Sequence, residues 1–277
     1  MSKNEASKVV LVTGASSGFG KHIAARLIAE GHIIYPAARR LDEMEALKTE
    51  HSQPIRLDVT DEALVRERVG GIIADHGRID VLINNAGYGI YDLIESCDIA
   101  RARAEFDVNF WGVAILTQAV VPHMRKLRSG RIINMSSGAG RVSGPMIGWY
   151  SASKFALEAF SDALRIEVGQ FGIKVSLVEP GIFKTGFGDV VTSHFAEIEC
   201  DDDYRSLVDA YVAGYSQRQK AAPSPEPVIE AVLDAVFSET PQTRYLVGDD
   251  ANALVANKAS MTDEEFDAVI KRYLRIE

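Results

Sequence analysis

The most constraining feature of this sequence is a regular alternation between short, continuously apolar runs and longer segments with helical periodicity. The segments between the runs place apolar residues three or four positions apart, as at Ile23, Leu27 and Ile28, which is typical of helices that cover a sheet. The apolar runs lie at 9–13, 32–38, 54–59, 79–85, 131–137, 173–180 and 244–248. Apolar strands that alternate with helices predict a parallel sheet buried on both faces. We therefore expect an α/β fold: a doubly wound, seven-stranded parallel sheet (Rossmann-like) with helices on both faces.

The length and the patterning of the second half predict the domain organisation. The chain has 277 residues, of which 47% are hydrophobic, and this suits one large core. We expect a single domain over 1–277. No strand-like run follows Gly181 until 244, so we expect a small helical substrate lid at about 186–222. A C-terminal helical extension is expected at about 249–277, where Thr262 and Glu265 have the spacing of a capping box.

Charge and cysteine content restrict the partners and the compartment. Lys and Arg number 30 against 39 Asp and Glu, so the net charge is −9, and no long basic block could neutralise a phosphate backbone. The longest apolar stretch is interrupted by Gln118 and Pro122 and is too short to cross a bilayer. Cys97 and Cys200 belong to no CxxC pair. We therefore expect a cytoplasmic protein with no nucleic-acid partner and no membrane span.

A glycine-rich turn, "TGASSGFG" at 13–20, follows the first apolar run and precedes a helical segment. Glycines at a strand-to-helix junction let a pyrophosphate approach the backbone N–H groups, and the helix dipole favours the anion there. In this context the turn predicts a dinucleotide site rather than a plain reversal of the chain. The residues expected at the cofactor are Gly14, Ser16, Ser17, Gly18, Phe19 and Gly20.

The end of the second expected strand predicts which dinucleotide binds. Where an acid would accept the 2′-hydroxyl of an NAD ribose, this chain has Ala38, followed by Arg39 and Arg40. Guanidinium groups suit a 2′-phosphate, so we expect NADP(H) rather than NAD(H); Arg40 could also be a solvated residue that opens a helix. Asp58 and Val59, at the end of the third run, are expected near the adenine, although an Asp there is often only a cap.

Tyr150 and Lys154 lie four positions apart at the head of an amphipathic segment, 148–168. Residues with this spacing share one face of a helix. A tyrosine has a pKa of about 10 and needs help to act near neutral pH, and a nearby ammonium group would lower that pKa by stabilising the phenolate. An isolated pair of this kind is more often ordinary helix packing, so its meaning depends on the residues that accompany it.

Four motifs accompany the pair: "TGASSGFG" at 13–20, "NNAG" at 84–87, a serine on the fifth strand followed by "YSASK", and "PGIFKT" at 180–185. Over roughly residues 8–190 their order and spacing resemble the classical short-chain dehydrogenase/reductase family. The stretches "NAGYG", "EPG" and "GRIINMSSGAG" resemble its 17β-hydroxysteroid dehydrogenase-like and retinol dehydrogenase-like branch.

The resemblance implies an activity and a set of site residues. The implied catalytic residues are Asn109, Ser137, Tyr150 and Lys154; Ser136 competes with Ser137, but the family's step from serine to tyrosine selects Ser137. The implied cofactor contacts include Tyr150 and Lys154 together with Asn85, Ala86, Gly87, Pro180, Gly181, Ile182 and Thr185. The implied reaction is the NADP(H)-dependent interconversion of a carbonyl and an alcohol, with Tyr150 as general acid or base. Helices over 101–127 and 151–168 would form a homo-dimer or homo-tetramer.

The substrate end is expected to be apolar. Ser143, Met146, Trp149 and Phe187 are expected to shape it, which favours an apolar ketone, aldehyde or secondary alcohol. The six histidines show no HxH or HExxH spacing, so no metal is expected. One alternative is an NADP-binding redox sensor or scaffold without turnover, against which the intact Ser137, Tyr150 and Lys154 argue. A sugar-nucleotide epimerase or dehydratase shares the Tyr-x-x-x-Lys pair but has a different glycine spacing.

Overall fold

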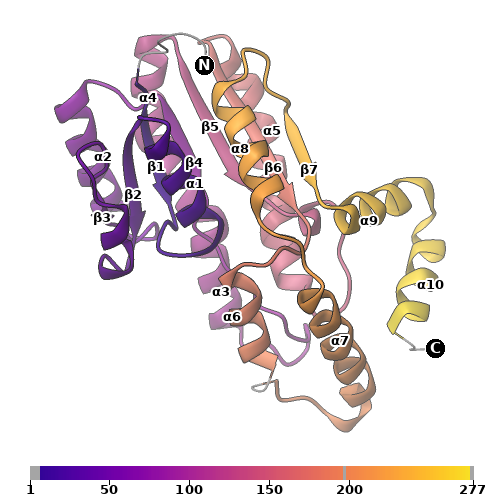
Figure 1. Ribbon diagram of the computed structural model, residues 1–277. Helices are drawn as coiled ribbons and strands as arrows, with labels where there is room; N and C mark the ends of the chain where they lie inside the picture. The colour runs from indigo at the N-terminus through magenta and orange to yellow at the C-terminus, as the bar shows by residue number, and fades with distance from the viewer. Residues whose placement is uncertain (1–6, 196–197, 275–277) are drawn as a thin grey trace.

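A computed structural model of the chain describes residues 7–195 and 198–274, and its centre is one parallel sheet (Figure 1). The strands are β1 (Val9–Thr13), β2 (Ile33–Ala38), β3 (Ile55–Arg56), β4 (Val81–Asn84), β5 (Gly130–Met135), β6 (Ile173–Pro180) and β7 (Arg244–Val247). They are ordered β3-β2-β1-β4-β5-β6-β7, and every pair is parallel. The strand order reverses between β1 and β4, the point where doubly wound sheets bind ligands at their carboxyl edge. The predicted fold class is confirmed.

Helices cover both faces of the sheet. One face carries α1 (Gly18–Ala29) and α8 (Glu226–Phe237), and the other carries α2 (Glu62–His76), α4 (Gly112–Leu127) and α5 (Gly148–Gly169). Shorter helical segments connect these layers: η1 (Asp42–Leu47), α3 (Ile99–Phe106), the π-helical turn η2 (Asp107–Trp111) and η3 (Gly138–Gly140). The chain runs from α3 through η2 into α4 without a break, so residues on η2 are held between two helices.

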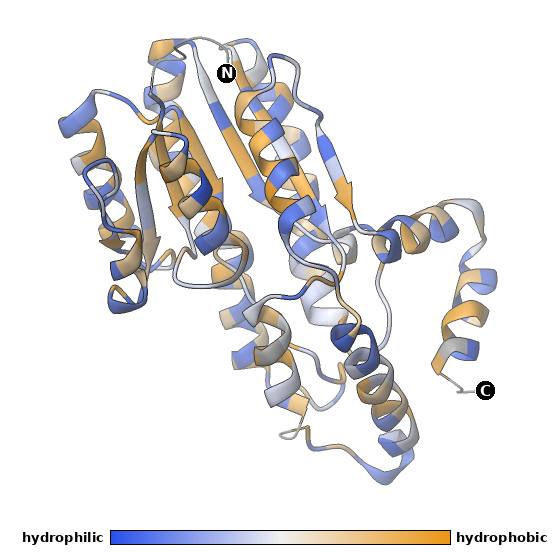
Figure 2. Ribbon diagram, in the orientation of Figure 1, coloured by the Kyte–Doolittle hydropathy of each residue, from blue (hydrophilic) through white to orange (hydrophobic). Residues whose placement is uncertain are grey.

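The alternation of side chains along the strands explains why both faces are covered. All five residues of β1 are buried; Val10 and Val12 pack with α1 and α8, whereas Val9 and Leu11 pack with α2 and α4. Figure 2 shows the resulting pattern, with largely hydrophobic strands between helices of mixed hydropathy. A strand buried on both faces has no polar positions to present to water, which is why these runs are continuously apolar in the sequence.

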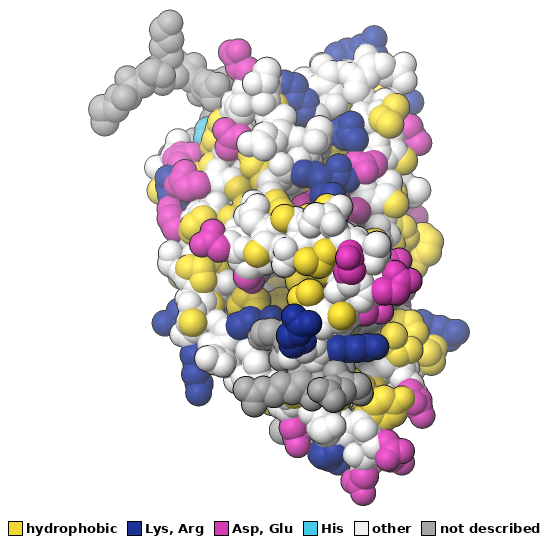
Figure 3. Space-filling model, turned by 90° about the vertical axis from the view of Figure 1, so that its right-hand side faces the viewer, with side chains coloured by type: hydrophobic (Ala, Val, Ile, Leu, Met, Phe, Trp, Pro, Cys, Tyr) yellow, Lys and Arg dark blue, Asp and Glu magenta, His cyan; other side chains and the backbone are white. Residues whose placement is uncertain are grey.

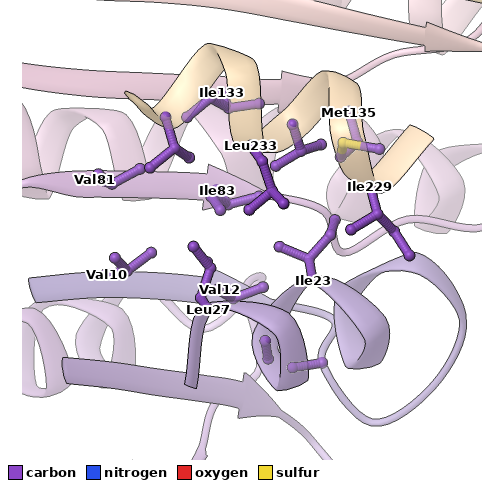
Figure 4. Close-up of a cluster of buried hydrophobic side chains, with 14 of the residues drawn as sticks. Val10, Val12, Ile23, Leu27, Val81, Ile83, Ile133, Met135, Ile229 and Leu233 are labelled. Carbon is purple, nitrogen blue, oxygen red and sulfur yellow. The ribbon is translucent and has the colours of Figure 1, made fainter. Parts of the chain in front are cut away.

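The packing on the α1 and α8 face is shown in Figure 4. Ile23 and Leu27 of α1, with Ile229 and Leu233 of α8, lie over the strand residue Ile83 and its neighbours. Burying each such side chain contributes roughly 1.5 to 3 kcal/mol. Because α1 begins at the glycine turn, this packing also fixes the position of that turn.

The third strand is much shorter than predicted. The expectation was 54–59, but β3 comprises only Ile55–Arg56 at the edge of the sheet. Leu57 still donates its N–H to Ala38 O at 2.9 Å. The chain then turns because the Asp58 carboxylate accepts hydrogen bonds from both the N–H and the hydroxyl of Thr60, at 3.0 and 2.8 Å, a local alternative to strand pairing.

The regions after β6 and β7 are helical. The segment predicted as a lid contains α6 (Gly186–His194) and α7 (Asp202–Lys220), and the C-terminal segment contains α9 (Asp249–Ser260) and α10 (Asp263–Leu274). The capping box at α10 is formed: Thr262 N–H donates to Glu265 at 2.9 Å, and Glu265 N–H donates to the Thr262 hydroxyl at 3.2 Å. α10 returns to α7, where Leu274 packs among its side chains.

One face of the molecule carries charged side chains of both signs. On the face seen in Figure 3, basic and acidic side chains are interspersed and hydrophobic ones are scattered among them. No helix in the described part of the chain combines the length and the apolarity needed to cross a bilayer.

Candidate functional site

A cavity of about 890 Å³ opens at the carboxyl edge of the sheet, beside the reversal of strand order. Its walls come from the glycine turn, the ends of β2 to β6, the start of α5, and helices α6, α7 and α9. The predicted site residues on these walls are Gly14, Ser16, Ser17, Gly18, Phe19, Arg39, Arg40, Asp58, Val59, Asn85, Ala86, Gly87, Ser137, Tyr150, Lys154, Pro180, Gly181, Ile182, Thr185 and Phe187. The fold therefore brings the four sequence motifs to one place.

The glycine turn is packed so closely that side chains are excluded from it. Gly14 has φ 66°, and a Cβ there would lie 2.8 Å from Ala86 Cα. Gly20 does not line the cavity; a Cβ on it would collide with the Asn85 carboxamide and lie 2.5 Å from Gly14 O. Gly14 thus allows the left-handed backbone conformation of the turn and its close contact with Ala86. Gly20 allows the start of α1 to pack against Gly14 and Asn85. Such a bare backbone at a helix N-terminus can receive a pyrophosphate.

The "NNAG" segment is tied to the glycine turn by hydrogen bonds. The Thr13 hydroxyl accepts the N–H groups of Asn85 and Ala86 at 3.0 and 3.1 Å. The Asn85 carboxamide in turn donates to Thr13 O at 2.9 Å and to Gly14 O at 3.2 Å. The Asn85 carboxamide therefore connects the loop after β4 to the loop after the neighbouring strand β1.

The basic residues after β2 lie at the far end of the cavity. Arg39 and Arg40 are exposed and line it together with Ala38 and Asp58. Within residues 7–195 and 198–274, neither guanidinium has an acidic partner. Two unpaired guanidinium groups at the mouth of a cavity can bind a phosphate.

The segment after β6 lies against the glycine turn, with the Phe183 ring packed edge-on against Phe19, and is held from two sides. Gly181 N–H donates to Val247 O at 2.8 Å, and Ile182 N–H donates to the Asp250 carboxylate of α9 at 2.8 Å. Thr185 caps α6 by accepting the N–H of Phe187 at 3.4 Å. Asp250 was not singled out in the sequence; its only signal is its place just after β7.

Tyr150, Lys154 and Ser137 meet at the centre of the cavity. Tyr150 and Lys154 are on the first turns of α5, both nearly fully buried, with the Lys154 ammonium 5.8 Å from the centre of the Tyr150 ring. Lys154 donates to Met135 O at 2.8 Å. Ser137 follows β5, and its hydroxyl accepts the N–H of Ala139 at 3.1 Å. Ser136 is buried, with its hydroxyl against Gly140, so Ser137 is the serine that reaches the phenol.

Burial dominates the electrostatics of this pair. Burial raises the pKa of Tyr150 above its ordinary value, and a hydrogen bond with Ser137 opposes that rise. Burial also lowers the pKa of Lys154 to about 8, opposed by the charges of Glu105 and Glu158. The sequence predicts that the ammonium lowers the pKa of the tyrosine; in the structure burial sets the direction, and the pKa of Tyr150 is raised. Desolvation penalises whichever form is charged.

Asn109 lies behind the cavity rather than on it. It occupies the π turn η2 and is fully buried. Its Oδ1 accepts Tyr88 N–H at 3.0 Å, and its Nδ2 donates to Tyr88 O at 2.8 Å and to the Ser153 hydroxyl at 3.0 Å. Ser153 donates to Tyr150 O at 2.8 Å. The residue thus joins the loop after β4 to the helix that carries the tyrosine.

Aromatic side chains form the end of the cavity that faces α6 and α7. Tyr91 is stacked on Tyr150, with ring centres 6.0 Å apart, and its ring also contacts those of Tyr211 and Tyr215. Phe187 packs against Tyr150. Tyr211 and Tyr215 are one helical turn apart on α7. Tyr91, Tyr211 and Tyr215 were not predicted from the sequence; the four-residue spacing of the last two was the available signal. This end of the cavity suits an apolar molecule.

Three residues predicted around the substrate do not line the cavity. Ser143 is exposed on a loop. Met146 has φ 69° and is buried with Leu93, Val208 and the α7 tyrosines. Trp149 packs against α3 and lines a separate hollow. Adjacent helical residues point about 100° apart, so Trp149 cannot face the pocket that Tyr150 faces.

The comparisons with known proteins agree with this arrangement. Residues 8–194 match the family described as short chain dehydrogenase. A 3-ketodihydrosphingosine reductase of Bacteroides thetaiotaomicron is 39% identical over 254 residues, which are 91% of this chain and 92% of that protein. The 17-beta-hydroxysteroid dehydrogenase type 1 of Mus musculus is 35% identical over 86% of this chain and 72% of its own length.

Two solved structures are also similar. A short-chain dehydrogenase from Streptomyces avermitilis has a TM-score of 0.81 and 32% identity, covering 99% of this chain and 98% of its own. A metagenomic short-chain oxidoreductase in complex with NADP has a TM-score of 0.69 and 26% identity, covering 87% of this chain and 96% of its own.

Proposed function

The chain belongs to the short-chain dehydrogenase family, whose members are oxidoreductases. From this premise we propose that it is an NADP(H)-dependent enzyme. Its reaction interconverts a ketone or aldehyde and the corresponding alcohol on an apolar small molecule. The convergence of Tyr150, Lys154 and Ser137 on one cavity carries the proposal. At one end of that cavity lies a bare glycine turn beside Arg39, and at the other a wall of aromatic rings.

The residues present fit a nicotinamide dinucleotide. Gly14 leaves a cradle that any Cβ would fill, Arg39 and Arg40 would hold a 2′-phosphate, and Asp58 and Val59 would lie beside the adenine. Pro180, Gly181, Ile182 and Thr185 would hold the nicotinamide end. When bound, the nicotinamide supplies or accepts the hydride. The unpaired guanidinium groups and the missing acid at Ala38 support NADP(H) over NAD(H).

The catalytic residues of this chain handle the proton. In the reducing direction the Ser137 hydroxyl donates a hydrogen bond to the carbonyl oxygen as negative charge develops on it. Tyr150, which burial keeps neutral, donates its phenolic proton to the same oxygen. The Lys154 ammonium then stabilises the phenolate that is left. Because burial makes the phenol hold its proton more tightly, proton donation depends on the stabilisation of the phenolate by Lys154.

The aromatic wall supports an apolar substrate. Phe187, Tyr91, Tyr211 and Tyr215 surround the space beside Tyr150, and such surfaces bind alkyl chains and flat ring systems well. The names of two relatives therefore suggest the first members of a panel: 3-ketodihydrosphingosine, and the 17-ketone that corresponds to a 17β-hydroxysteroid.

The test is a panel of carbonyl compounds, scored by loss of NADPH absorbance and by isolation of the alcohol. We expect turnover of long-chain or polycyclic ketones, and much weaker turnover of sugars. If the protein binds NADPH but oxidises none of it across the panel, the proposal fails and a redox sensor or scaffold without turnover takes its place.

We also propose that the chain forms a homo-dimer or homo-tetramer through the outer faces of α4 and α5. Phe155 and Ile166 on α5 are 45% and 74% exposed, and Trp111, just before α4, and Leu127, the last residue of α4, are also exposed. Exposed large apolar side chains are typical of interfaces.

A further inference from the structure

Glu105 is a buried carboxyl group close to the catalytic pair that the chemistry described so far does not use. It lies on α3 and is 0% exposed. Its Oε1 accepts Ile90 N–H at 3.3 Å and Asn109 Nδ2 at 3.4 Å. Its Oε2 is buried and has no hydrogen-bond partner among the described residues. A buried carboxyl oxygen without a hydrogen bond lowers the stability of the folded state. A functional role for Glu105, four residues before Asn109, would explain why it is there.

The Asn109 side chain connects Glu105 to the site. Its Nδ2 contacts both Glu105 and the Ser153 hydroxyl, which donates to the backbone of Tyr150. Its Oδ1 and the Lys154 ammonium both flank Gly87: a Cβ there would lie 3.0 Å from the first and 3.6 Å from the second. Glu105, Asn109 and Lys154 are therefore successive members of one buried polar cluster.

The charges around Glu105 couple it to the catalytic residues. The titratable groups that face it are Lys154 and Tyr150 from α5, and Tyr88 and Cys97 from the segment between β4 and α3. Burial raises the pKa of Glu105 to about 8, opposed by the Ile90 hydrogen bond and the Lys154 charge. The Glu105 charge in turn raises the pKa of both Tyr150 and Lys154. Near neutral pH the group can therefore both release and accept a proton.

We propose that Glu105 is a positioning residue of this enzyme that acts through Asn109 as an internal proton store for Lys154 and Tyr150. This rests on the proposed function. In reduction, the Tyr150 O–H bond breaks as the O–H bond of the alcohol forms, while the two electrons arrive with the hydride from the cofactor. The phenolate regains a proton from the Lys154 ammonium. The neutral amine takes a proton from the Glu105 carboxylic acid through a water molecule at Asn109, and the carboxylate recovers a proton from solvent.

The first test is Glu105→Gln, which keeps the size and one hydrogen-bonding oxygen but holds no exchangeable acid proton. We expect kcat for reduction to fall by roughly tenfold or more and the KM for NADPH to stay within about twofold. The inflection in the pH profile of kcat should move to lower pH, because the Glu105 charge no longer raises the pKa of Lys154. Glu62→Gln, on the exposed part of α2, is the control. An unchanged kcat, or an inflection that stays at its original pH, would overturn the proposal.

A second test needs no turnover and separates this inference from the proposed function. Carbon-13 NMR of carboxyl-labelled glutamate should show a residue that titrates near pH 8 and is absent in Glu105→Gln; Glu179, whose pKa burial and Glu158 raise to about 7, gives a separate signal. In Lys154→Met the pKa of Glu105 should rise, because the opposing positive charge is gone. If the pKa of Glu105 is the same in Lys154→Met as in the unmodified protein, the coupling is refuted, whether or not a substrate has been found.

Discussion

Arg39 shows how much a single residue decides at this site. Its guanidinium has no acidic partner among the described residues and lies on the cavity wall beside Ala38, where an NAD-specific site would have an acid. In Arg39→Ala we expect the Kd for NADPH to rise by at least about tenfold, the loss of a charge-assisted hydrogen bond worth roughly 1.5 to 3 kcal/mol. The Kd for NADH should change little. Arg66→Ala, on the exposed face of α2, serves as the control, and equal losses for both cofactors would refute the 2′-phosphate site.

Residues on the cavity wall were predictable where a motif fixed both type and spacing. Asn85, Ser137, Tyr150, Lys154 and most of the glycine turn were predicted in this way, and they line the cavity. Trp149 and Met146 were placed wrongly because apolar character does not show direction: Trp149 is turned toward α3 by the helix itself, and the left-handed backbone of Met146 sends its side chain toward α7. Glu105 was missed because an acid in a charged helix is normally solvated.

At the scale of elements, the C-terminal helix α9 supports the segment that would hold the nicotinamide. Its Asp250 accepts the Ile182 N–H and sits directly over Gly181, where a Cβ would lie 2.6 Å from the carboxyl carbon. Gly181→Ala should therefore raise the KM for NADPH several-fold and lower the Tm. Asp250→Ala should partly rescue Gly181→Ala, because the collision is removed; a double-mutant cycle measures this coupling. Strictly additive effects would show that α9 does not position the segment.

The elements themselves were predicted well because their cause is local. β1 and β6 have the predicted bounds, since continuous apolar runs between turns permit little else. β3 is shorter than predicted because Asp58 ends it by accepting hydrogen bonds from Thr60. An apolar run does not show that such a local turn will form in place of strand pairing. The positions of α7, α9 and α10 around the cavity depend on contacts distant in sequence, so their helical nature was predictable and their packing was not.

At the scale of the whole molecule, the exposed apolar side chains of α4 and α5 predict self-association. Ile166→Asp combined with Phe155→Asp should convert the protein to a monomer in sedimentation velocity, because two buried, unpaired carboxylates would oppose the contact. Leu41→Asp, an exposed apolar position outside these helices, should leave the assembly intact. An unchanged sedimentation coefficient for the double variant would exclude this surface as the interface.

The buried carboxyl groups also predict how stability depends on pH. The pKa values of Glu105 and Glu179 rise on folding to about 8 and about 7, against about 4.3 in the unfolded chain. The folded state thus binds more protons between about pH 4.5 and 7, so the free energy of unfolding falls as the pH rises through that window. Lys154, whose pKa is lowered, acts in the opposite direction only above about pH 8.

Thermal unfolding should therefore give a higher Tm at about pH 5.5 than at about pH 7.5. Glu179→Gln should reduce the difference, whereas Glu62→Gln should not. A Tm that rises over this range in the unmodified protein would show that these carboxyl groups are already ionised in the folded state.

The central claim is that the buried Tyr150 phenol supplies the proton for carbonyl reduction. The direct measurement compares the unmodified protein with Tyr150→Phe in single-turnover reduction of a ketone, together with NADPH binding by fluorescence. We predict that removal of the hydroxyl lowers the rate by roughly 10² to 10⁴-fold while NADPH binds within about threefold of its original affinity. A variant that still reduces the ketone within tenfold of the original rate would contradict it.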